Sequence, residues 1–431
     1  MLELKEVMDN KILADKRFGN TGLSLISVKS EEEIADVLRS ANEKGKTVSI
    51  VSGGTKRGYG GLKEEYDVVL SLAEYRGIVE HTVGDMTVTV RPGTTIAELQ
   101  NFLRKHDQMV SLDPSWPEQA TIGGVIAANE SGPKRLKYGS ARDLVIGLRV
   151  VYPDGSVIRT GGKVVKNVAG YDMNKLFIGA MGTLGAISEI TLKLRPVPKD
   201  ESLVLLSVKE EHVDELKTFA IKVQDSMVEP VTLELVNPTL SKQLWDREAY
   251  TLLMGFEDVP NAVQYQEEWV RAQKPKEAVM DVLPANEAMD FWNRFANIAP
   301  NSLTDNSENG EVKANLKIGS KNMQVMDVLK EADRFQRQYG VTLAAHGGLG
   351  HGLTNAYLTG SEDQIKAVVR ELRDFVESKQ GYAVLKHLPF YLREELNVWG
   401  KGQSYHFLFE GIKRKVDPNN SLNHQRFVGG I

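Results

Sequence analysis

The chain has 431 residues, enough for two or three domains, and its 41% hydrophobic and 26% charged residues are ordinary for a globular protein. A net charge of −5 gives no general basic surface for nucleic acid, and the absence of cysteine excludes disulfides, thiolate metal sites and a self-ligated iron–sulfur cluster. The chain start lacks a signal-peptide pattern and no apolar run reaches about 18 residues, so we expect a cytoplasmic protein without a membrane span.

The first periodic segment predicts a helix that leads into a strand. Ser30–Glu33 carries the S-x-x-E pattern of a capping box, apolar residues then repeat at helical spacing, and Gly45 can end the helix. The strand Val48–Val51 follows. Further strand-like segments are Val68–Leu72 and Thr87–Arg91, and a second capped helix begins at Thr95–Glu98. Helices and strands therefore mix in this part of the chain.

A glycine-rich loop follows the strand directly and reads Ser52-Gly-Gly-Thr-Lys-Arg-Gly-Tyr-Gly-Gly61. Glycine allows a positive φ and a close approach of ligand to backbone, and successive exposed N–H groups form an anion-binding nest. Lys56 and Arg57 add positive charge. The loop matches neither the Walker pattern nor the G-x-G-x-x-G fingerprint, so by itself it is either a phosphate or pyrophosphate site of another kind or a flexible surface turn.

Later elements suggest a change of domain near residue 200. Leu148–Thr160 predicts a hairpin around a Pro-Asp-Gly turn, and Arg195–Pro198 interrupts regular structure after the strand Ala186–Leu194. Strand candidates then alternate with helical patterns at Met326–Tyr339 and Gln364–Glu377, which predicts an antiparallel sheet covered by helices. These strand candidates are Leu203–Val208, Val231–Val236, Thr251–Phe256, Val312–Ile318, Val341–Ala345 and Tyr382–Leu385. We predict domains at residues 1–200 and 201–405, with a segment 406–431 that packs back on the first.

Two more glycine-rich segments follow the first loop. One includes Thr121–Gly124 and Tyr138–Asp143; the other runs from Lys166 to Ile187 and includes Gly182-Thr-Leu-Gly185. Taken in order, the three segments resemble the FAD-binding domain of the PCMH-type (vanillyl-alcohol-oxidase) superfamily, in particular its glycolate oxidase and D-lactate dehydrogenase group. The short chain resembles the FAD-binding subunit of bacterial glycolate oxidase. The resemblance implies an α+β fold, with a PCMH-type FAD-binding domain followed by an α+β cap domain that contains an antiparallel sheet.

The resemblance implies that all three segments contact FAD. Ser52–Gly58 would hold the pyrophosphate through backbone N–H groups, and Thr121–Gly124 would add amides at a helix start. Covalent members place His in the loop, where this chain has Thr55, or use Cys, so the FAD should be noncovalent. The implied contacts are Ser52, Gly53, Gly54, Thr55, Lys56, Arg57, Gly58, Thr121, Gly123, Gly124, Asn129, Ser131, Gly132, Tyr138, Gly139, Ser140, Arg142, Asp143, Gly182, Thr183, Gly185, Ile187 and Asn423.

Histidines of the second domain are the catalytic candidates. Oxidation of a 2-hydroxy acid needs a cation for the carboxylate and a base for the hydroxyl proton, while the flavin accepts the hydride. The family pattern His-x-Gly-Asp-Gly-Asn-x-His is reduced here to His346-Gly-Gly-Leu-Gly-His351, and His387 lies where relatives have Glu-His-Gly. These three histidines could hold a divalent metal, act without metal as base or substrate contact, or be structural. Candidate carboxylate binders, unless they are solvated surface residues, are Arg294, Lys313 and Lys317.

Two functions remain open at this stage. The first is an FAD-dependent oxidoreductase that acts on a small 2-hydroxy acid of the glycolate or D-lactate type, as a subunit of a glycolate oxidase. The second is a flavin-bearing accessory subunit without its own substrate chemistry, because the histidine pattern is degraded. Either would work with a catalytic flavin subunit and an iron–sulfur subunit, through which the chain could associate with a membrane. A weaker alternative is a flavoreductase resembling UDP-N-acetylenolpyruvoylglucosamine reductase.

Overall fold

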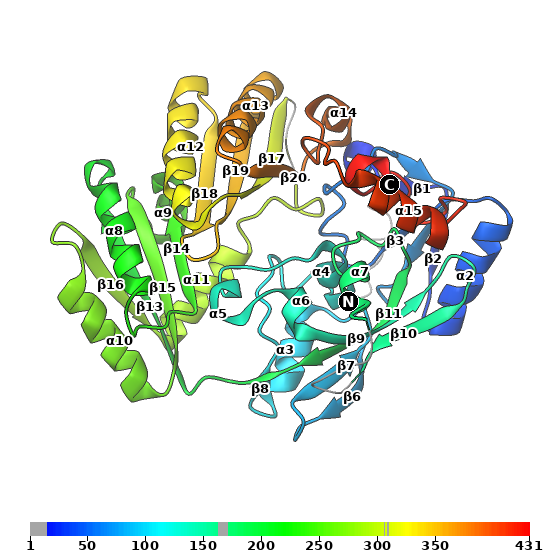
Figure 1. Ribbon diagram of the computed structural model, residues 1–431, viewed down its shortest axis with the longest axis horizontal. Helices are drawn as coiled ribbons and strands as arrows, with labels where there is room; N and C mark the ends of the chain where they lie inside the picture. The colour runs from blue at the N-terminus through cyan, green and yellow to red at the C-terminus, as the bar shows by residue number, and fades with distance from the viewer. Residues whose placement is uncertain (1–14, 163–170, 306, 308–309) are drawn as a thin grey trace.

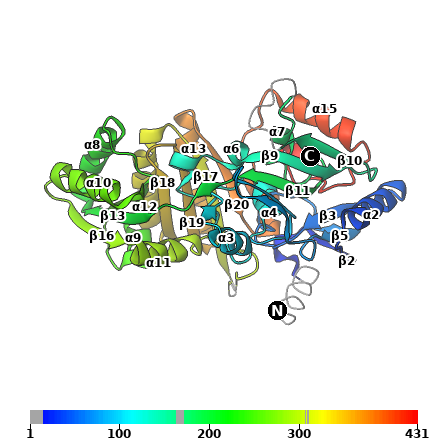
Figure 2. The same ribbon diagram turned by 90° about the horizontal axis from the view of Figure 1, so that it is seen from below.

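The structure is a computed structural model that describes residues 15–162, 171–305, 307 and 310–431. Two lobes lie side by side, one formed by the first half of the chain with the C-terminal segment, the other by the eight-stranded sheet and its helices (Figures 1 and 2). Among the described residues, no helix is long and apolar enough to cross a bilayer.

The N-terminal lobe contains a parallel and an antiparallel sheet. The parallel sheet has the order β2 (Leu25–Ser27), β5 (Val68–Ser71), β3 (Val48–Val51), and the antiparallel sheet has the order β10 (Val157–Gly161), β9 (Val145–Val151), β11 (Ala186–Lys193), β7 (Thr87–Val90), β6 (Ile78–Thr82). Two short pairs join β1 (Thr21–Gly22) to β4 (Glu65–Tyr66) and β8 (Gln108–Met109) to β12 (Arg195–Pro196). The helices are α2 (Glu31–Glu43), α3 (Ile96–Arg104), α4 (Ile122–Ala128), α5 (Arg135–Tyr138), α6 (Ala141–Leu144) and α7 (Asn174–Phe177).

Local sequence signals explain several of these elements. Thr95 and Glu98 form the full capping box of α3. At α2 the Ser30 hydroxyl accepts from the Glu33 amide at 3.1 Å, but the Glu33 carboxylate accepts from the Lys29 amide at 2.7 Å instead of closing the box. The predicted hairpin is confirmed, since β9 and β10 pair antiparallel around the Pro-Asp-Gly turn.

The C-terminal lobe is one antiparallel sheet of eight strands, with helices on both faces. Its order is β16 (Val279–Pro284), β13 (Asp200–Val208), β15 (Tyr250–Asp258), β14 (Thr232–Val236), β18 (Thr342–Gly348), β19 (Leu353–Ser361), β17 (Glu311–Gly319), β20 (Tyr382–His387). The main core of the lobe joins one face to α8 (Val213–Gln224), α10 (Pro260–Gln273), α12 (Val325–Tyr339) and α13 (Glu362–Ser378), and a smaller core joins the other face to α9 (Pro238–Trp245) and α11 (Ala285–Ala296). The predicted α+β architecture with an antiparallel sheet is confirmed, whereas β16 and β19 were absent from the predicted strands.

Strand register places polar residues together on one face of this sheet. Lys317 on β17 is opposite Asn355 on β19, which in turn is opposite His346 on β18. Asn315 is likewise opposite Tyr357. Because side chains alternate along a strand, the intervening apolar residues point to the other face and enter the main core.

The C-terminal segment contacts the N-terminal lobe. After α14 (Arg393–Leu396) and α15 (His406–Val416), Leu422 forms an isolated parallel bridge with Val48. The buried ammonium of Lys413 donates to the Asp417 carboxylate at 2.6 Å and to the carbonyls of Thr183 and Leu422. These contacts hold the last residues beside β3, where the glycine-rich loop begins.

Candidate functional site

A cleft in the N-terminal lobe follows the glycine-rich segments, and we call it the glycine cleft. Its walls are residues 50–57 at the end of β3, the start of α4, and residues 181–187 before and within β11. Asn423 and Arg426 of the C-terminal segment complete it. Asn423 is fixed in place because its side chain accepts from the Ile50 amide at 2.8 Å and donates to the Met181 carbonyl at 2.7 Å.

Close backbone contacts explain the glycines of the first loop. A Cβ at Gly53 would collide with the carbonyl oxygen of Gln119, and Gly54 has a φ of +68°. A Cβ at Gly58 would lie 2.5 Å from the His387 ring nitrogen. The loop can therefore lie between the N-terminal lobe and the C-terminal sheet only with glycine at these positions.

Two buried arginines stabilise the glycine-rich loop through hydrogen bonds to backbone carbonyl oxygens. Arg393 donates to the carbonyl oxygens of Phe18, Arg57, Gly60, Gly61 and Leu388 at 2.6–3.2 Å. The Arg57 guanidinium donates to the Asp15 and Gly19 carbonyls at 2.6 and 3.1 Å. Burial and neighbouring guanidinium groups lower the pKa of Arg393 to about 9. The Arg57 side chain therefore ties the glycine-rich loop to residues 15–19 by hydrogen bonds.

Unpartnered polar atoms in the glycine cleft suit an anionic guest. The buried Ser52 Oγ, Thr121 Oγ1 and Arg426 Nε have no hydrogen-bond partner among the residues that the structure describes, and all three residues line the cleft. Thr121 is also the N-cap of α4, although its side chain makes no capping bond. Hydroxyl and guanidinium donors around glycine backbone match the oxygens of a diphosphate.

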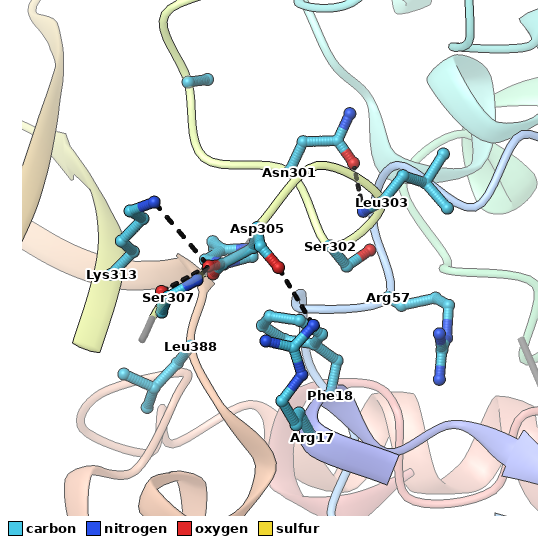
Figure 3. Close-up of polar contacts among 12 residues, drawn as sticks. Arg17, Phe18, Arg57, Asn301, Ser302, Leu303, Asp305, Ser307, Lys313 and Leu388 are labelled. Atoms are coloured by element: carbon cyan, nitrogen blue, oxygen red, sulfur yellow. Dashed lines mark hydrogen bonds and ion pairs between the residues drawn. The ribbon is translucent and has the colours of Figure 1, made fainter. Parts of the chain in front are cut away.

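A loop from the C-terminal lobe closes over the glycine-rich loop, as Figure 3 shows. Ser302 Oγ donates to the Gly54 carbonyl at 2.9 Å. The buried Asp305 carboxylate lies 3.2 Å from His387 Nε2, and Lys313 lies 3.8 Å from the same carboxylate. Burial lowers the pKa of His387 and outweighs the attraction of Asp305. His387 is therefore bound to Asp305 behind Gly58.

A second cavity lies where the polar face of the sheet meets the end of α4. This polar pocket has a volume of about 30 Å³ and shares Ala128 with the glycine cleft. Glu130 in its wall lies 2.8 Å from Lys386 and 3.7 Å from Lys56. Burial would raise the pKa of Glu130, but the two ammonium groups outweigh it and lower the pKa to about 2. Its other ionisable lining residues are Arg135, Glu234, Lys317, His346 and His351.

His346 forms a buried hydrogen-bonded chain at this pocket. Its Nδ1 lies 2.6 Å from the Glu234 carboxylate and its Nε2 lies 2.9 Å from the Tyr357 hydroxyl. His351 Nε2 is 3.7 Å from the same carboxylate. Because the Glu234 carboxylate accepts a hydrogen bond from Nδ1–H, Nε2 is left to accept one from the Tyr357 hydroxyl. Burial raises the pKa of Tyr357 above its ordinary range, so this phenol stays protonated.

A larger cavity of about 420 Å³, the interdomain chamber, opens from the polar pocket. Both cavities are lined by Glu130, His346, Asn355 and Lys386, whereas Tyr357 lines the chamber but not the polar pocket. Apolar residues of both lobes form part of the chamber wall, including Leu112, Trp292 and Phe295. The His346 chain therefore lies at the junction of a polar and a partly apolar space.

The structure brings part of the predicted FAD set to the glycine cleft. The residues that line it are Ser52, Gly53, Gly54, Thr55, Lys56, Arg57, Thr121, Gly123, Gly124, Gly182, Gly185, Ile187 and Asn423. Asn129, Ser131 and Gly132 line the polar pocket, and Tyr138 lines the chamber, where its hydroxyl donates to Glu257 at 2.5 Å.

The other residues of that set have local roles in the fold. Ser140 and Asp143 cap α6, the exposed Arg142 donates to the Lys175 carbonyl, and Thr183 donates to the Ala180 carbonyl. Gly139 lies against Asp143 and Gly58 against His387. The stretch Lys166–Gly170 of the third motif lies outside the described residues. FAD contact by any of these residues stays a prediction.

The three candidate histidines do not meet. His346 and His351 share Glu234, whereas His387 is bound to Asp305. Within the described part of the chain, no group of three or more His, Asp or Glu side chains is arranged to hold a metal ion. Of the candidate carboxylate binders, Lys317 lines the polar pocket and Lys313 pairs with Asp305, whereas Arg294 lies over the Phe291 ring.

Sequence reasoning missed Glu130, Arg135, Glu234, Tyr357 and Lys386. Alternation of polar and apolar residues in Leu353–Ser361 could have revealed β19 and with it Tyr357. The Glu130–Lys386 pair joins residues 256 positions apart, and no local pattern encodes it.

Known FAD-binding proteins resemble the part of the chain that contains the first two glycine-rich segments of the cleft. The family model described as an FAD binding domain matches residues 23–161. Glycolate oxidase subunit GlcD of Bacillus subtilis is 35% identical over 218 residues, which cover 50% of this chain and 46% of that protein. D-lactate dehydrogenase of Archaeoglobus fulgidus is 31% identical over 248 residues, 55% of each chain. The chain thus spans about half the length of these curated relatives.

The overall fold also has solved counterparts. The structure superposes on 4-ethylphenol oxidase from Gulosibacter chungangensis with a TM-score of 0.74 and 15% sequence identity. The superposition covers 97% of this chain and 93% of the oxidase chain. This similarity extends over both lobes and concerns the fold alone. The family match identifies residues 23–161 as an FAD binding domain, and the chain as a whole has the fold of 4-ethylphenol oxidase.

Proposed function

We propose that the protein is an FAD-dependent oxidoreductase that oxidises a small 2-hydroxy acid at the junction of the polar pocket and the interdomain chamber. The observation that carries the proposal is the grouping there of a carboxylate-binding cation, Lys386, with a hydrogen-bonded base, His346. This junction adjoins the glycine cleft, since Lys56 of the glycine-rich loop approaches Glu130 in the pocket wall. Curated relatives named as a glycolate oxidase subunit and a D-lactate dehydrogenase support the same class of substrate.

FAD bound in the glycine cleft supplies the acceptor for the hydride that leaves C2 of the substrate. Lys386 binds the substrate carboxylate, and Glu130 and its ion pair hold this ammonium in position. The substrate hydroxyl donates to Tyr357 Oη. Its proton moves to that oxygen while the phenol proton moves to His346 Nε2, 2.9 Å away. The Glu234 carboxylate then stabilises the imidazolium through Nδ1.

Anaerobic mixing of the purified holoprotein with glycolate or D-lactate tests this function. We expect the flavin absorbance to bleach. A Tyr357→Phe variant should keep FAD but lose on the order of 100-fold in reduction rate, the usual size of a general acid–base contribution. A Tyr382→Phe variant is the matched control, because Tyr382 is a half-exposed tyrosine on β20 of the same sheet, separated from β19 by β17. Equal rates for both variants would remove the Tyr357–His346 chain from the mechanism.

A second candidate function is that of a flavin-bearing accessory subunit. Leu349 and Leu353 replace the Asp and His of the pattern that this chain resembles, which favours this alternative. Its partners would be a catalytic flavin subunit and an iron–sulfur subunit. No bleaching by the chain alone, followed by bleaching when such partners are added, would select the accessory role.

A further inference from the structure

The polar pocket contains more positive than negative charge. Three cations, Lys386, Arg135 and Lys317, line it together with two carboxylates, Glu130 and Glu234. Glu130 lies 2.8 Å from Lys386 and also 3.7 Å from Lys56 of the glycine-rich loop. Arg135 donates to Ser131 Oγ at 2.8 Å, and among the described residues neither Arg135 nor Lys317 has a carboxylate within ion-pair distance. Cations that are withdrawn from water without an anionic partner are costly, so this arrangement is explained best by an anion that the ligand brings.

The positions of these cations separate two binding regions. Lys386, His346 and Asn355 line both the polar pocket and the chamber, which puts the reacting end of a substrate at their junction. Arg135 and Lys317 line only the polar pocket. A ligand held at the junction can therefore extend either into the chamber or inward toward these two cations.

The polar pocket suits a group as small as a carboxylate. Including the junction, its volume of about 30 Å³ corresponds to roughly two waters, on a scale where about 10–15 Å³ holds one. His351 Nε2, whose ring accepts from the Leu353 amide at Nδ1, is a buried donor that lines the pocket and has no hydrogen-bond partner among the described residues. Burial and repulsion by Lys386 lower the pKa of Lys317 to about 8, which a bound anion would reverse.

We propose that the substrate is a 2-hydroxydicarboxylic acid whose second carboxylate enters the polar pocket between Arg135 and Lys317. The proposal rests on the proposed function of the junction, where Lys386 takes the carboxylate next to the hydroxyl-bearing carbon. A second carboxylate gives Arg135 and Lys317 an anionic partner, whereas glycolate or lactate leaves both of these cations without one. Reaction at the junction is the same for both kinds of acid.

Paired substrates test the proposal on the holoprotein. Anaerobic flavin reduction is measured with D-malate and D-2-hydroxyglutarate, and with glycolate and D-lactate as monocarboxylates. We expect at least a 10-fold higher kcat/KM for one of the dicarboxylates. Lys317→Gln should lower that value by at least 30-fold while changing the value for D-lactate by less than 3-fold. Lys313→Gln is the matched control, because this lysine lies on the same strand and pairs with Asp305 outside the polar pocket.

Binding without turnover separates this proposal from the proposed function. Calorimetry with 2-oxoglutarate and pyruvate should give tighter binding of the dicarboxylate, and Lys317→Gln should abolish the difference even if no hydroxy acid bleaches the flavin. In that case the proposed function is wrong, but the site for the second carboxylate between Arg135 and Lys317, here called the dianion site, is confirmed. Equal binding of the two oxo acids, equal losses for both substrate classes, or a Lys317→Gln variant that loses only FAD affinity would overturn the dianion site.

Discussion

Replacing Arg393 by Met tests whether a buried guanidinium shapes the glycine-rich loop. The side chain is fully buried and serves five carbonyl oxygens. Asn20 also donates to the carbonyls of Arg57 and Gly60, so the substitution removes the side-chain donor chiefly from those of Phe18, Gly61 and Leu388. Each buried acceptor left unpaired costs about 1–3 kcal/mol.

The expected loss follows from these contacts. Three unpaired carbonyls would cost several kcal/mol, and release of a buried charge offsets part of that cost. We expect the free energy of unfolding to fall by about 4 kcal/mol and the affinity for FAD to fall with it. Urea titration followed by tryptophan fluorescence, with and without added FAD, measures both. Arg370→Met is the control, because Arg370 is exposed and pairs with the exposed Glu395, which predicts a loss of at most about 1 kcal/mol. Equal losses for the two variants would refute the supporting role of Arg393.

Two further predictions follow from the same contacts. Gly53→Ala places a Cβ against the Gln119 carbonyl, so we expect a displaced loop and at least a 10-fold weaker FAD affinity, measured by fluorescence titration, with Gly84→Ala as a control in open space. Lys317 has a pKa lowered to about 8, so without ligand about a tenth of its ammonium groups stay charged at pH 9; binding of an anionic substrate analogue such as 2-oxoglutarate should therefore be strong below pH 8 and weaken as the pH rises through and above 8. An affinity for 2-oxoglutarate that is flat from pH 7 to pH 9 would contradict the second of these.

Sequence patterns predicted the elements whose signals are local. The two helix starts, the Pro-Asp-Gly hairpin and the apolar strands of the second lobe all depend on residues a few positions apart, and the structure contains them. Gly53 and Gly54 were predicted as loop glycines for the same reason. The close approach of the Gln119 carbonyl, which makes glycine necessary at residue 53, is a long-range contact that the pattern could not contain.

The site itself depends on contacts across the chain. Arg393 lies in the polar stretch Arg393-Glu-Glu-Leu, which is typical of an exposed helix, yet it is fully buried among carbonyls of distant segments. His387 resembled a catalytic residue by its place in a motif, but its partner Asp305 lies 82 positions away. Spacing along the chain could name the histidines without showing which of them share a cavity.

Release of the cofactor tests the central claim most directly. We propose that the glycine cleft binds FAD without a covalent bond, through backbone and hydroxyl donors. Denaturing the purified holoprotein and analysing the supernatant should yield about one FAD per chain, and calorimetry of the stripped protein should show FAD rebinding. A supernatant without FAD, together with no heat on adding excess FAD to the stripped protein, would contradict the account.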